Sequence, residues 1–502
     1  MLDPRTPVLV GVGQVTQRTD DPAGSAEAVE LMRQAAEAAA LDACAPDLLA
    51  RVQLTIVPKG LWAYPDVAGQ LAASIGAGSP TATGESGRTV VGEVGILQQS
   101  LITRACADIA AGRLDVALVA GGEARHRAVM AARQGIEATD TLTPGAPDEL
   151  LLADGEIYTA VEMERDLLVP AHQYALIESA LRHLDGISAT EQAERLGRLW
   201  AGFAAVAAAN PLAWDRSDPD GATIATPTPD NRMIATPYTK RLCSQWNVDQ
   251  AAALLLLSVE AAEAAGVPRD RWVFLRATAE SQAMVTLPAR AELHRSFGTA
   301  LVGRAALRSL GLTLDDVAHL DLYSCFPAAV QVQARELGLT IDGPGRDPRP
   351  LTVTGGMTFA GGPLNTYVLH ATAAMAHVLR DDAGSTGLVT TVSGIVTKPA
   401  VALWSTDPGP GAFEAIDMTT ETRAAIVTRP IEADATGSGI IVGHTVVHDG
   451  GVPARAVAIV EFASGARTVA IDADADRAAA TLIDDRVGEA VDVPAPGILA
   501  CR

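Results

Sequence analysis

Three short stretches in the second half of the chain bring together residue types that could do chemistry. They are "YSCFP" (323–327), "GGMTFAGGPLN" (355–365) and "SGIVTKP" (393–399), each near the predicted C-terminal end of a strand. Ligands of parallel α/β sheets bind beyond the carboxyl ends of the strands, so we expect the three stretches to form one site. Tyr323 and Cys325 are the candidate catalytic residues of that site.

The position of Cys325 supports two interpretations. Pro327, two residues later, suits the first turn of a helix. The N-terminus of a helix lowers the pKa of a nearby thiol, which would make Cys325 reactive. A small apolar cysteine packed in the core fits the same surroundings. Position alone leaves the two interpretations open.

Other motifs in the chain are weak. "GVGQVT" (11–16) lacks the third glycine of a dinucleotide fingerprint, so a tight turn after a strand is expected there. "DADADR" (472–477) begins like a calcium loop, but Arg477 and Ile483 stand where that loop needs glycine and glutamate. The histidines show no ligand spacing, and the sequence contains neither a GxSxG elbow nor a P-loop. We therefore expect no metal site.

Composition narrows the function further. The chain has 502 residues, 48% of them apolar, and a formal net charge of −22, which disfavours nucleic acid and anionic membranes as partners. Its five cysteines are odd in number and widely spaced, so a reducing cytoplasm without disulfides is expected. The beginning of the chain lacks the pattern of a signal peptide. The apolar stretch 251–267 contains two glutamates and is too short to span a membrane; we expect it to be a buried helix.

Two parts of the chain alternate between strand and helix periodicity. Val-rich strands and apolar helices follow one another through residues 7–124, and the same order returns after about residue 270. This pattern predicts an α/β fold with mostly parallel, buried sheets, built from one unit used twice. The expected strands lie at 7–15, 51–58, 115–124, 271–281, 317–324, 350–356, 386–395 and 400–406, and the expected helices at 26–41, 66–77, 94–112, 291–312, from 327, and 365–380.

The rest of the chain has a different character. Residues 126–269 mix helical stretches with a long irregular segment, and such excursions usually shape a binding site. After residue 413 only short strands with turn residues follow, which predicts a small antiparallel β-barrel. We expect domains at 1–125, 126–269, 270–408 and 414–502.

Taken in order, four stretches resemble the thiolase superfamily, and within it the class related to sterol-carrier-protein thiolases. "HLDLYSCFPAAV" (319–330) is similar to that class's His-Asp-Cys-Phe segment, and "GGMTFAGGPLN" (355–365) to its Gly-His-Pro segment. "AAVAAANPLAW" (204–214) resembles the loop-domain helix that ends in Asn-Pro, and "SQWNVDQAAALLLLS" (244–258) the helix that opens the second half. The resemblance covers about residues 5–406.

The resemblance implies a fold, a ligand and a site. It implies a duplicated five-layered αβαβα core with a loop domain over the site, and coenzyme A or an acyl-CoA as a ligand without any covalently bound cofactor. The 414–502 barrel resembles OB-like domains that accompany such proteins. The residues implied to bind substrate or coenzyme A are Gly361, Gly362, Asn365, Ser393 and Gly394.

The sequence departs from the thiolase pattern at the residues that do the chemistry. The nucleophilic cysteine of thiolases would fall near Gly95 or Ile96, and the Gly-His-Pro histidine falls on Gly362. Tyr323 replaces the His or Asn that binds an oxyanion, and the last motif offers Lys398 without a catalytic cysteine or histidine. Losing a nucleophile, a histidine and an oxyanion donor together makes ordinary thiolysis improbable.

Three hypotheses of function follow from the resemblance and its departures. The first is a thiolase-like protein of lipid metabolism, nominally an acyltransferase of the acetyl-CoA acetyltransferase type, that binds acyl-CoA without ordinary thiolysis. The second is a retro-aldol lyase acting on β-hydroxyacyl-CoA with Tyr323 as the acid–base residue. The third is a non-catalytic scaffold in lipid or sterol catabolism. Besides acyl-CoA, we expect the protein to have one of two partners, a second copy of the chain or a partner enzyme of lipid catabolism.

Overall fold

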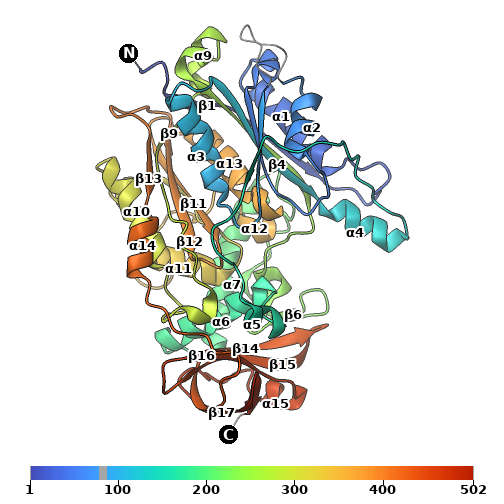
Figure 1. Cartoon of the computed structure of the whole chain (residues 1–502), viewed down its shortest axis with the longest axis vertical. Coiled ribbons are helices and arrows are strands. Elements are labelled where there is room, and N and C mark those ends of the chain that lie inside the picture. Colours follow the sequence, from blue (N-terminus) through green and yellow to red (C-terminus); the bar gives the residue numbers. More distant parts are fainter. Residues whose placement is uncertain (1, 78–86, 501–502) are drawn as a thin grey trace.

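The computed structural model describes residues 2–77 and 87–500, which leaves Cys501 outside the described residues. A first sheet of six strands lies in the upper part of the molecule (Figure 1). Its strands run β1, β8, β4, β2, β3, β5 across the sheet, with bounds Pro7–Gln17, Asp249–Ser258, Val116–Ala124, Leu54–Pro58, Arg88–Gly92 and Glu149–Leu151. A second sheet runs β10 (His319–Asp321), β11 (Thr386–Ser393), β12 (Lys398–Ser405), β9 (Phe274–Glu280) and β13 (Glu414–Asp417).

Helices cover both sheets and fill the space between them. Helices α1 (Ala28–Asp42) and α2 (Val67–Ser74) pack on the outer face of the first sheet. Helices α3 (Gln98–Ala110) and α13 (Tyr367–Asp381) lie between the two sheets and contact both. Helices α10 (Phe297–Ser309) and α11 (Pro327–Leu337) belong to the outer layer of the second sheet, where α10 packs on β9 and β12. The predicted αβαβα arrangement is confirmed.

Both sheets are mixed rather than mostly parallel, so that part of the prediction is wrong. In the first sheet β8 runs antiparallel to both β1 and β4, while β4, β2, β3 and β5 are parallel. In the second, β12 is antiparallel to both of its neighbours. Local periodicity reports burial and not strand direction, because a parallel and an antiparallel strand covered on both faces carry the same apolar residues.

Strand β8 also corrects the prediction of a helix at 251–267. All ten of its residues are buried, and its side chains divide by strand periodicity. Ala252, Leu254 and Leu256 join the core between the sheets, whereas Leu255 and Leu257 join the core beneath α1. A strand covered on both faces is a continuous apolar run, which sequence alone does not separate from a buried helix. The short helix α9 (Val259–Ala264) follows, so the first sheet takes a strand from the predicted connecting region.

The strand predicted at 350–356 is absent from the described chain. In this segment the backbone amide of Val353 donates to the Asp321 carboxylate at 3.0 Å, and the Thr352 hydroxyl donates to the same oxygen at 2.9 Å. The Asp321 side chain thus accepts the hydrogen bond from Val353 that the carbonyl of a neighbouring strand would otherwise accept. The segment continues into the short helix α12 (Gly356–Phe359).

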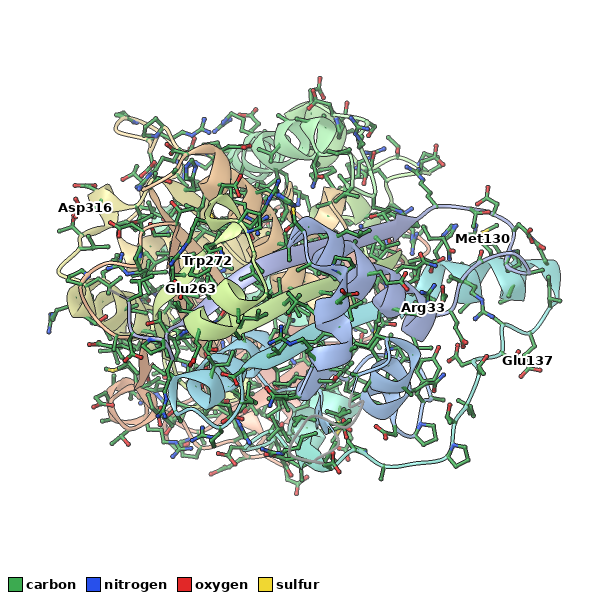
Figure 2. The ribbon with its side chains drawn as sticks, turned by 90° about the horizontal axis from the view of Figure 1, so that it is seen from above. Arg33, Met130, Glu137, Glu263, Trp272 and Asp316 are labelled. Atoms are coloured by element: carbon green, nitrogen blue, oxygen red, sulfur yellow. The ribbon has the colours of Figure 1, made fainter. Side chains whose placement is uncertain are left out.

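A layer of helices lies between this core and the C-terminal barrel (Figure 1). Helix α6 (Pro170–Asp185) packs against barrel strand β14 (Gly437–Asp449), and β6 (Met233–Ala235) pairs with the same strand. The intervening helices and strands are α5 (Ala160–Glu164), α6 (Pro170–Asp185), α7 (Ala189–Ala209), α8 (Gly221–Ala225), β6 (Met233–Ala235) and β7 (Tyr238–Thr239). Helix α4 (Arg125–Gln134) stands out from the body of the molecule, with Met130 in the helix and Glu137 in the segment that follows it (Figure 2).

The C-terminal region closes into a five-stranded barrel. Its strands are β14 (Gly437–Asp449), β15 (Val452–Phe462), β16 (Arg467–Asp472), β17 (Ala490–Ala495) and β18 (Ile498–Ala500), with the short helix α15 (Ala475–Ala480) packed on β15 and helix α14 (Thr419–Ala425) ahead of the barrel. The strands pair in the order β14, β15, β16, β18, β17 and back to β14. Only the β16–β18 pair is parallel, and the predicted small, OB-like barrel is confirmed. Within the described residues, no helix is long and apolar enough to cross a lipid bilayer.

Candidate functional site

Cys325 lies in the short connection between β10 and α11. Pro327 is the first residue of α11, as predicted, and its ring matches the backbone angle of a first helical turn. Only 8% of Cys325 is exposed, and the hydroxyl of Tyr174 from α6 forms a hydrogen bond with its thiol. The Tyr174 ring also stacks on Phe326, with the ring centroids 4.6 Å apart. The loop domain thus supplies the group that touches the thiol.

Burial raises the pKa of the Cys325 thiol to about 12. The Tyr174 hydroxyl and the backbone amide of Phe326 stabilise the thiolate, but they offset the loss of hydration only in part. Of the two interpretations of Cys325, burial favours the packed core cysteine over the activated thiol. Cys325 is protonated at neutral pH, and a protonated thiol is a poor nucleophile.

Tyr323 is held from both halves of the core. Its amide donates to the Thr390 hydroxyl at 2.7 Å, and its carbonyl accepts from the Gln333 side chain at 2.8 Å. Its hydroxyl forms a hydrogen bond with Gln98, the first residue of α3. Gln98 in turn accepts from the amide of Val368 in α13 at 2.7 Å. Burial raises the pKa of Tyr323, so its hydroxyl keeps its proton.

A buried carboxyl group lies behind Tyr323. Asp321 accepts hydrogen bonds from Thr352, Val353 and the Tyr367 hydroxyl, the last at 3.1 Å. Burial still raises the pKa of Asp321 to about 6. The rings of Tyr323 and Tyr367 meet edge to face at 5.7 Å, so this polar cluster helps to fix the Tyr323 ring.

The loop before α3 is tied to the second half of the core. The carbonyl of Gly95 accepts from the Lys398 ammonium at 2.8 Å and from the Ser393 hydroxyl at 3.3 Å. Lys398 is 1% exposed, and burial lowers its pKa. The position where the thiolase resemblance places a nucleophile therefore carries no thiol, and its backbone is held by a lysine. Cys106 lies farther along α3 in the core.

The loop that joins β11 to β12 is strained. Gly394, Ile395 and Val396 have φ of 58°, 54° and 70°. For a β-branched residue this conformation costs on the order of 1–2 kcal/mol. Such strain persists only where surrounding contacts fix it, and it gathers at functional sites. Here the Arg290 guanidinium donates to the Gly394 carbonyl at 2.9 Å, and the Ser296 hydroxyl to the Val396 carbonyl at 2.7 Å.

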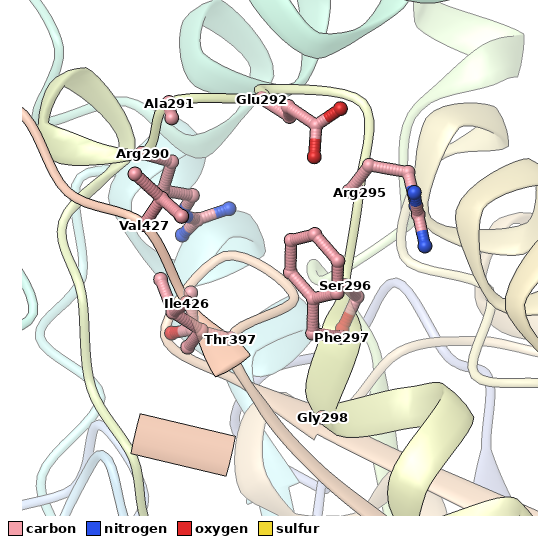
Figure 3. Close-up of a pocket in the computed structure, with 10 residues that line it drawn as sticks. All are labelled: Arg290, Ala291, Glu292, Arg295, Ser296, Phe297, Gly298, Thr397, Ile426 and Val427. Carbon is pink, nitrogen blue, oxygen red and sulfur yellow. The ribbon is translucent and has the colours of Figure 1, made fainter. Parts of the chain in front are cut away.

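Arg290 is a buried cation that forms no salt bridge among the described residues, although the nearby Glu162 carboxylate acts on it electrostatically. It is 3% exposed, donates to the carbonyls of Val285 and Gly394, and has no hydrogen-bond partner at Nη1 within the described part of the chain. Burial lowers its pKa to about 10, so it remains charged at neutral pH. Its charge acts on the Tyr174 hydroxyl. Arg290 also borders a small pocket, beside Val427 and across from Phe297, of about 20 Å³, which is room for about one water molecule (Figure 3).

The other predicted binding residues lie along the connection from α12 to α13. A side chain at Gly361, whose φ is 108°, would collide with Gln250, and one at Gly362 would meet Met357. The Asn365 side chain donates to the Lys59 carbonyl at 2.8 Å. The Gly362 amide donates to the Gln245 carbonyl, and the neighbouring Ser244 amide donates to the Cys325 carbonyl. Residues 244–245 therefore link this connection to Cys325, whereas Ser393 and Gly394 lie by Gly95 and Arg290.

Sequence reasoning missed Tyr174, Gln98 and Arg290 as parts of this site. A signal for the first was present, because the chain has only six tyrosines and four of them gather here. Tyr174 and Tyr238 pack on Phe326, while Tyr323 and Tyr367 pack on each other. No signal marks Gln98 or Arg290, because each is one polar residue among many until the fold buries it.

Together these side chains form a set of donors. Protonated tyrosine hydroxyls, a protonated thiol and one guanidinium can stabilise negative charge that develops on a substrate oxygen. Tyr323 can also give up a proton to such an oxygen. A larger cavity of about 340 Å³ lies between α7 and α11. The acids Asp185 and Asp342 pair with its arginines, and among the described residues its lining includes none of Cys325, Tyr323, Tyr174 and Arg290, so it is separate from this site.

Searches of protein-family models and of curated proteins give no match to this sequence. Among solved structures, a monomeric SCP2-thiolase like protein type 1 from Mycobacterium smegmatis superposes with a TM-score of 0.81. The two chains are 32% identical, over 99% of this chain and 98% of that one.

Two more distant structures show the same fold. The Ltp2–ChsH2(DUF35) aldolase has a TM-score of 0.57 at 20% identity, over 80% of this chain and 98% of that one. An acetyl-CoA acetyltransferase from Syntrophomonas wolfei has a TM-score of 0.55 at 19% identity, over 80% and 99%. The full-length likeness to the first structure confirms the thiolase resemblance read from the motifs: this chain belongs to the SCP2-thiolase-like proteins.

Proposed function

We propose that this protein binds acyl-CoA thioesters at the cluster formed by Cys325, Tyr323, Tyr174 and Arg290, and that it does not carry out ordinary thiolysis. The observation that carries the proposal is the chemical state of the two positions where a thiol would act. Gly95 and Ile96 offer none, and Cys325 is protonated, with a tyrosine as its side-chain partner. Covalent acyl transfer needs an activated nucleophile and a base as well as hydrogen-bond donors, and this site offers donors.

The test is a panel of 3-ketoacyl-CoA and 3-hydroxyacyl-CoA esters incubated with and without free coenzyme A, with products followed by mass spectrometry. We expect saturable binding and no chain shortening that depends on coenzyme A. Cys325→Ala and Tyr323→Phe are compared with Tyr64→Phe, a buried tyrosine of the first half that serves as the control. Chain shortening that needs coenzyme A and disappears in Cys325→Ala would overturn the proposal.

A second candidate is retro-aldol cleavage of a β-hydroxyacyl-CoA. The position of Tyr323 favours it, because its protonated hydroxyl lies beside Cys325 and is oriented by Gln98. In this reaction the β-hydroxyl loses its proton, the Cα–Cβ bond breaks, and a carbonyl compound leaves. The electron pair stays on the thioester enolate, which takes a proton from Tyr323 at Cα, and the Tyr323 oxygen takes up the proton that the β-hydroxyl lost, so the tyrosine ends the reaction protonated. Carbonyl release without added coenzyme A, lost in Tyr323→Phe and kept in Tyr64→Phe, would establish this reaction.

Binding without any turnover would favour the third function, a scaffold in lipid or sterol catabolism.

For the oligomeric state, the position of β5 favours a monomer over the homodimer considered from the resemblance. It occupies the edge of the first sheet beside β3, and the relative from M. smegmatis is described as monomeric. A cytoplasmic location fits the free thiols of Cys44, Cys106, Cys243 and Cys325.

A further inference from the structure

The barrel forms hydrogen bonds with the backbone of the segment that carries Arg290. Arg467 at the start of β16 is 2% exposed, and its guanidinium reaches across the domain junction. It donates to the Arg290 carbonyl, to the Ala291 carbonyl at 3.0 Å and to the Pro288 carbonyl at 3.4 Å. Its remaining donors bind Glu461 of β15, with Nε at 2.7 Å from the carboxylate. The printed hydrogen bonds of the Arg467 side chain thus either fix it to the barrel or hold the 288–291 segment.

A short ladder reinforces these hydrogen bonds. The segment before the barrel pairs with the same stretch, since the Ala291 amide donates to Val427 at 3.0 Å and the Arg429 amide to Ala289 at 2.8 Å. That segment is itself bound to β16, where the Arg467 amide donates to the Pro430 carbonyl at 2.8 Å. Three stretches of backbone are therefore hydrogen-bonded in series. They are β16 of the barrel, residues 427–430, and the 288–291 segment that carries Arg290.

The side chain of Arg290 continues the connection on the other side. Its guanidinium donates to the carbonyl of Gly394, the first of the three residues with positive φ. The same loop binds the carbonyl of Gly95 through the Ser393 hydroxyl. A path of direct hydrogen bonds thus runs from β16 through Arg290 to the β11–β12 loop and on to Gly95 in the loop before α3.

We propose that the barrel is a positioning element of the candidate site: Arg467 fixes the backbone of Arg290, and Arg290 in turn fixes the strained loop 394–396. Arg467 and Arg290 are positioning residues in this proposal. The inference rests on the proposed function only in counting that loop as part of the site. It assigns the barrel a task in the same chain that does not require the barrel to bind any ligand.

Hydrogen exchange followed by mass spectrometry tests the proposal on the whole protein without substrate. In Arg467→Lys, which keeps the charge but loses the fork that reaches three carbonyls, exchange in peptides covering 288–291 and 393–398 should become faster. Loss of one hydrogen bond allows local opening about fivefold more often. Arg467→Met should increase exchange further, so the two variants and wild type should form a graded series at 393–398.

Arg455→Lys is the matched control. Arg455 of β15 also joins the barrel to the loop domain, through Asp166, but it does not touch the 288–291 segment. This variant should leave exchange at 393–398 unchanged. Arg290→Lys tests the second step alone and should increase exchange at 393–398 while the barrel strands keep their protection.

Two results overturn the proposal. One is Arg467→Lys with faster exchange in the barrel and wild-type exchange at 393–398. The other is unchanged exchange at 393–398 in Arg290→Lys, which decides the matter even if the variants at Arg467 fail to fold. Because exchange is measured without acyl-CoA, it stands or falls separately from the turnover and binding experiments.

Discussion

The thiol of Cys325 should react about a thousandfold more slowly with iodoacetamide at pH 8 than a cysteine of ordinary pKa. Only the thiolate reacts. A rise of the pKa from 9.0 to about 12 lowers the thiolate fraction at pH 8 from about one tenth to about one ten-thousandth. The low exposure of Cys325, 8%, acts in the same direction.

The assay measures the alkylated fraction of each cysteine against time by peptide mass spectrometry. Cys44, which is exposed, supplies a comparison rate within the same sample. The pH dependence separates the two causes, because a high pKa makes the rate at Cys325 rise about tenfold per pH unit without a plateau up to about pH 10. Tyr174→Phe removes the side-chain hydrogen bond that stabilises the thiolate and should slow the reaction further, whereas Tyr64→Phe should not.

A plateau below about pH 9, or a rate at Cys325 that equals that of Cys44, would refute this reasoning. Either result would mean that Cys325 is a thiolate near neutral pH. The start of α11 would then outweigh burial, and Cys325 would again be a candidate nucleophile.

Three further predictions concern stability and assembly. Burial raises the pKa of Asp321 from 3.8 to about 6. Its contribution to the free energy of unfolding is therefore fully present below pH 3.8 and is lost as the pH rises through 6, by up to about 3 kcal/mol. The free energy of unfolding of Asp321→Asn in urea should therefore change less between pH 4 and pH 7 than that of wild type, whereas the exposed Asp315→Asn should follow wild type; parallel curves for all three would contradict the assignment. Lys398→Met leaves the Gly95 carbonyl with Ser393 as its remaining donor and should lower the free energy of unfolding by about 1–3 kcal/mol, and an unchanged value would mean that this bond stabilises nothing. Light scattering should give the mass of a single chain over a wide range of concentrations, and a dimer mass would show that β5 does not keep the edge covered.

The sequence predicted most of the elements that carry their own periodicity. Strands β1, β2 and β9 and helices α1 and α13 were expected near their observed positions, because each has an apolar pattern of one clear period. The failures have two physical origins. β8 is buried on both faces and lacks a period, and the 350–356 segment binds a carboxylate where a strand would be expected.

The site was predictable only in part, for a related reason. Tyr323 and Cys325 could be placed at a strand end, because that position follows from the order of the elements. The protonation of Cys325 depends on Tyr174 and on the depth of burial, which are set by elements some 150 residues away in the chain. Arg290 acquires its role only when Arg467 and Gly394 meet it from two domains.

The placement of β5 has a consequence for mass action. A sheet edge completed by a second chain makes the folded state depend on protein concentration. Here residues 149–151 complete the edge from within, and Asp148 accepts from both the amide and the hydroxyl of Thr89, at 2.8 and 3.0 Å. The partner strand is therefore always present at the effective concentration set by its own connection, and the sheet stays complete at any dilution.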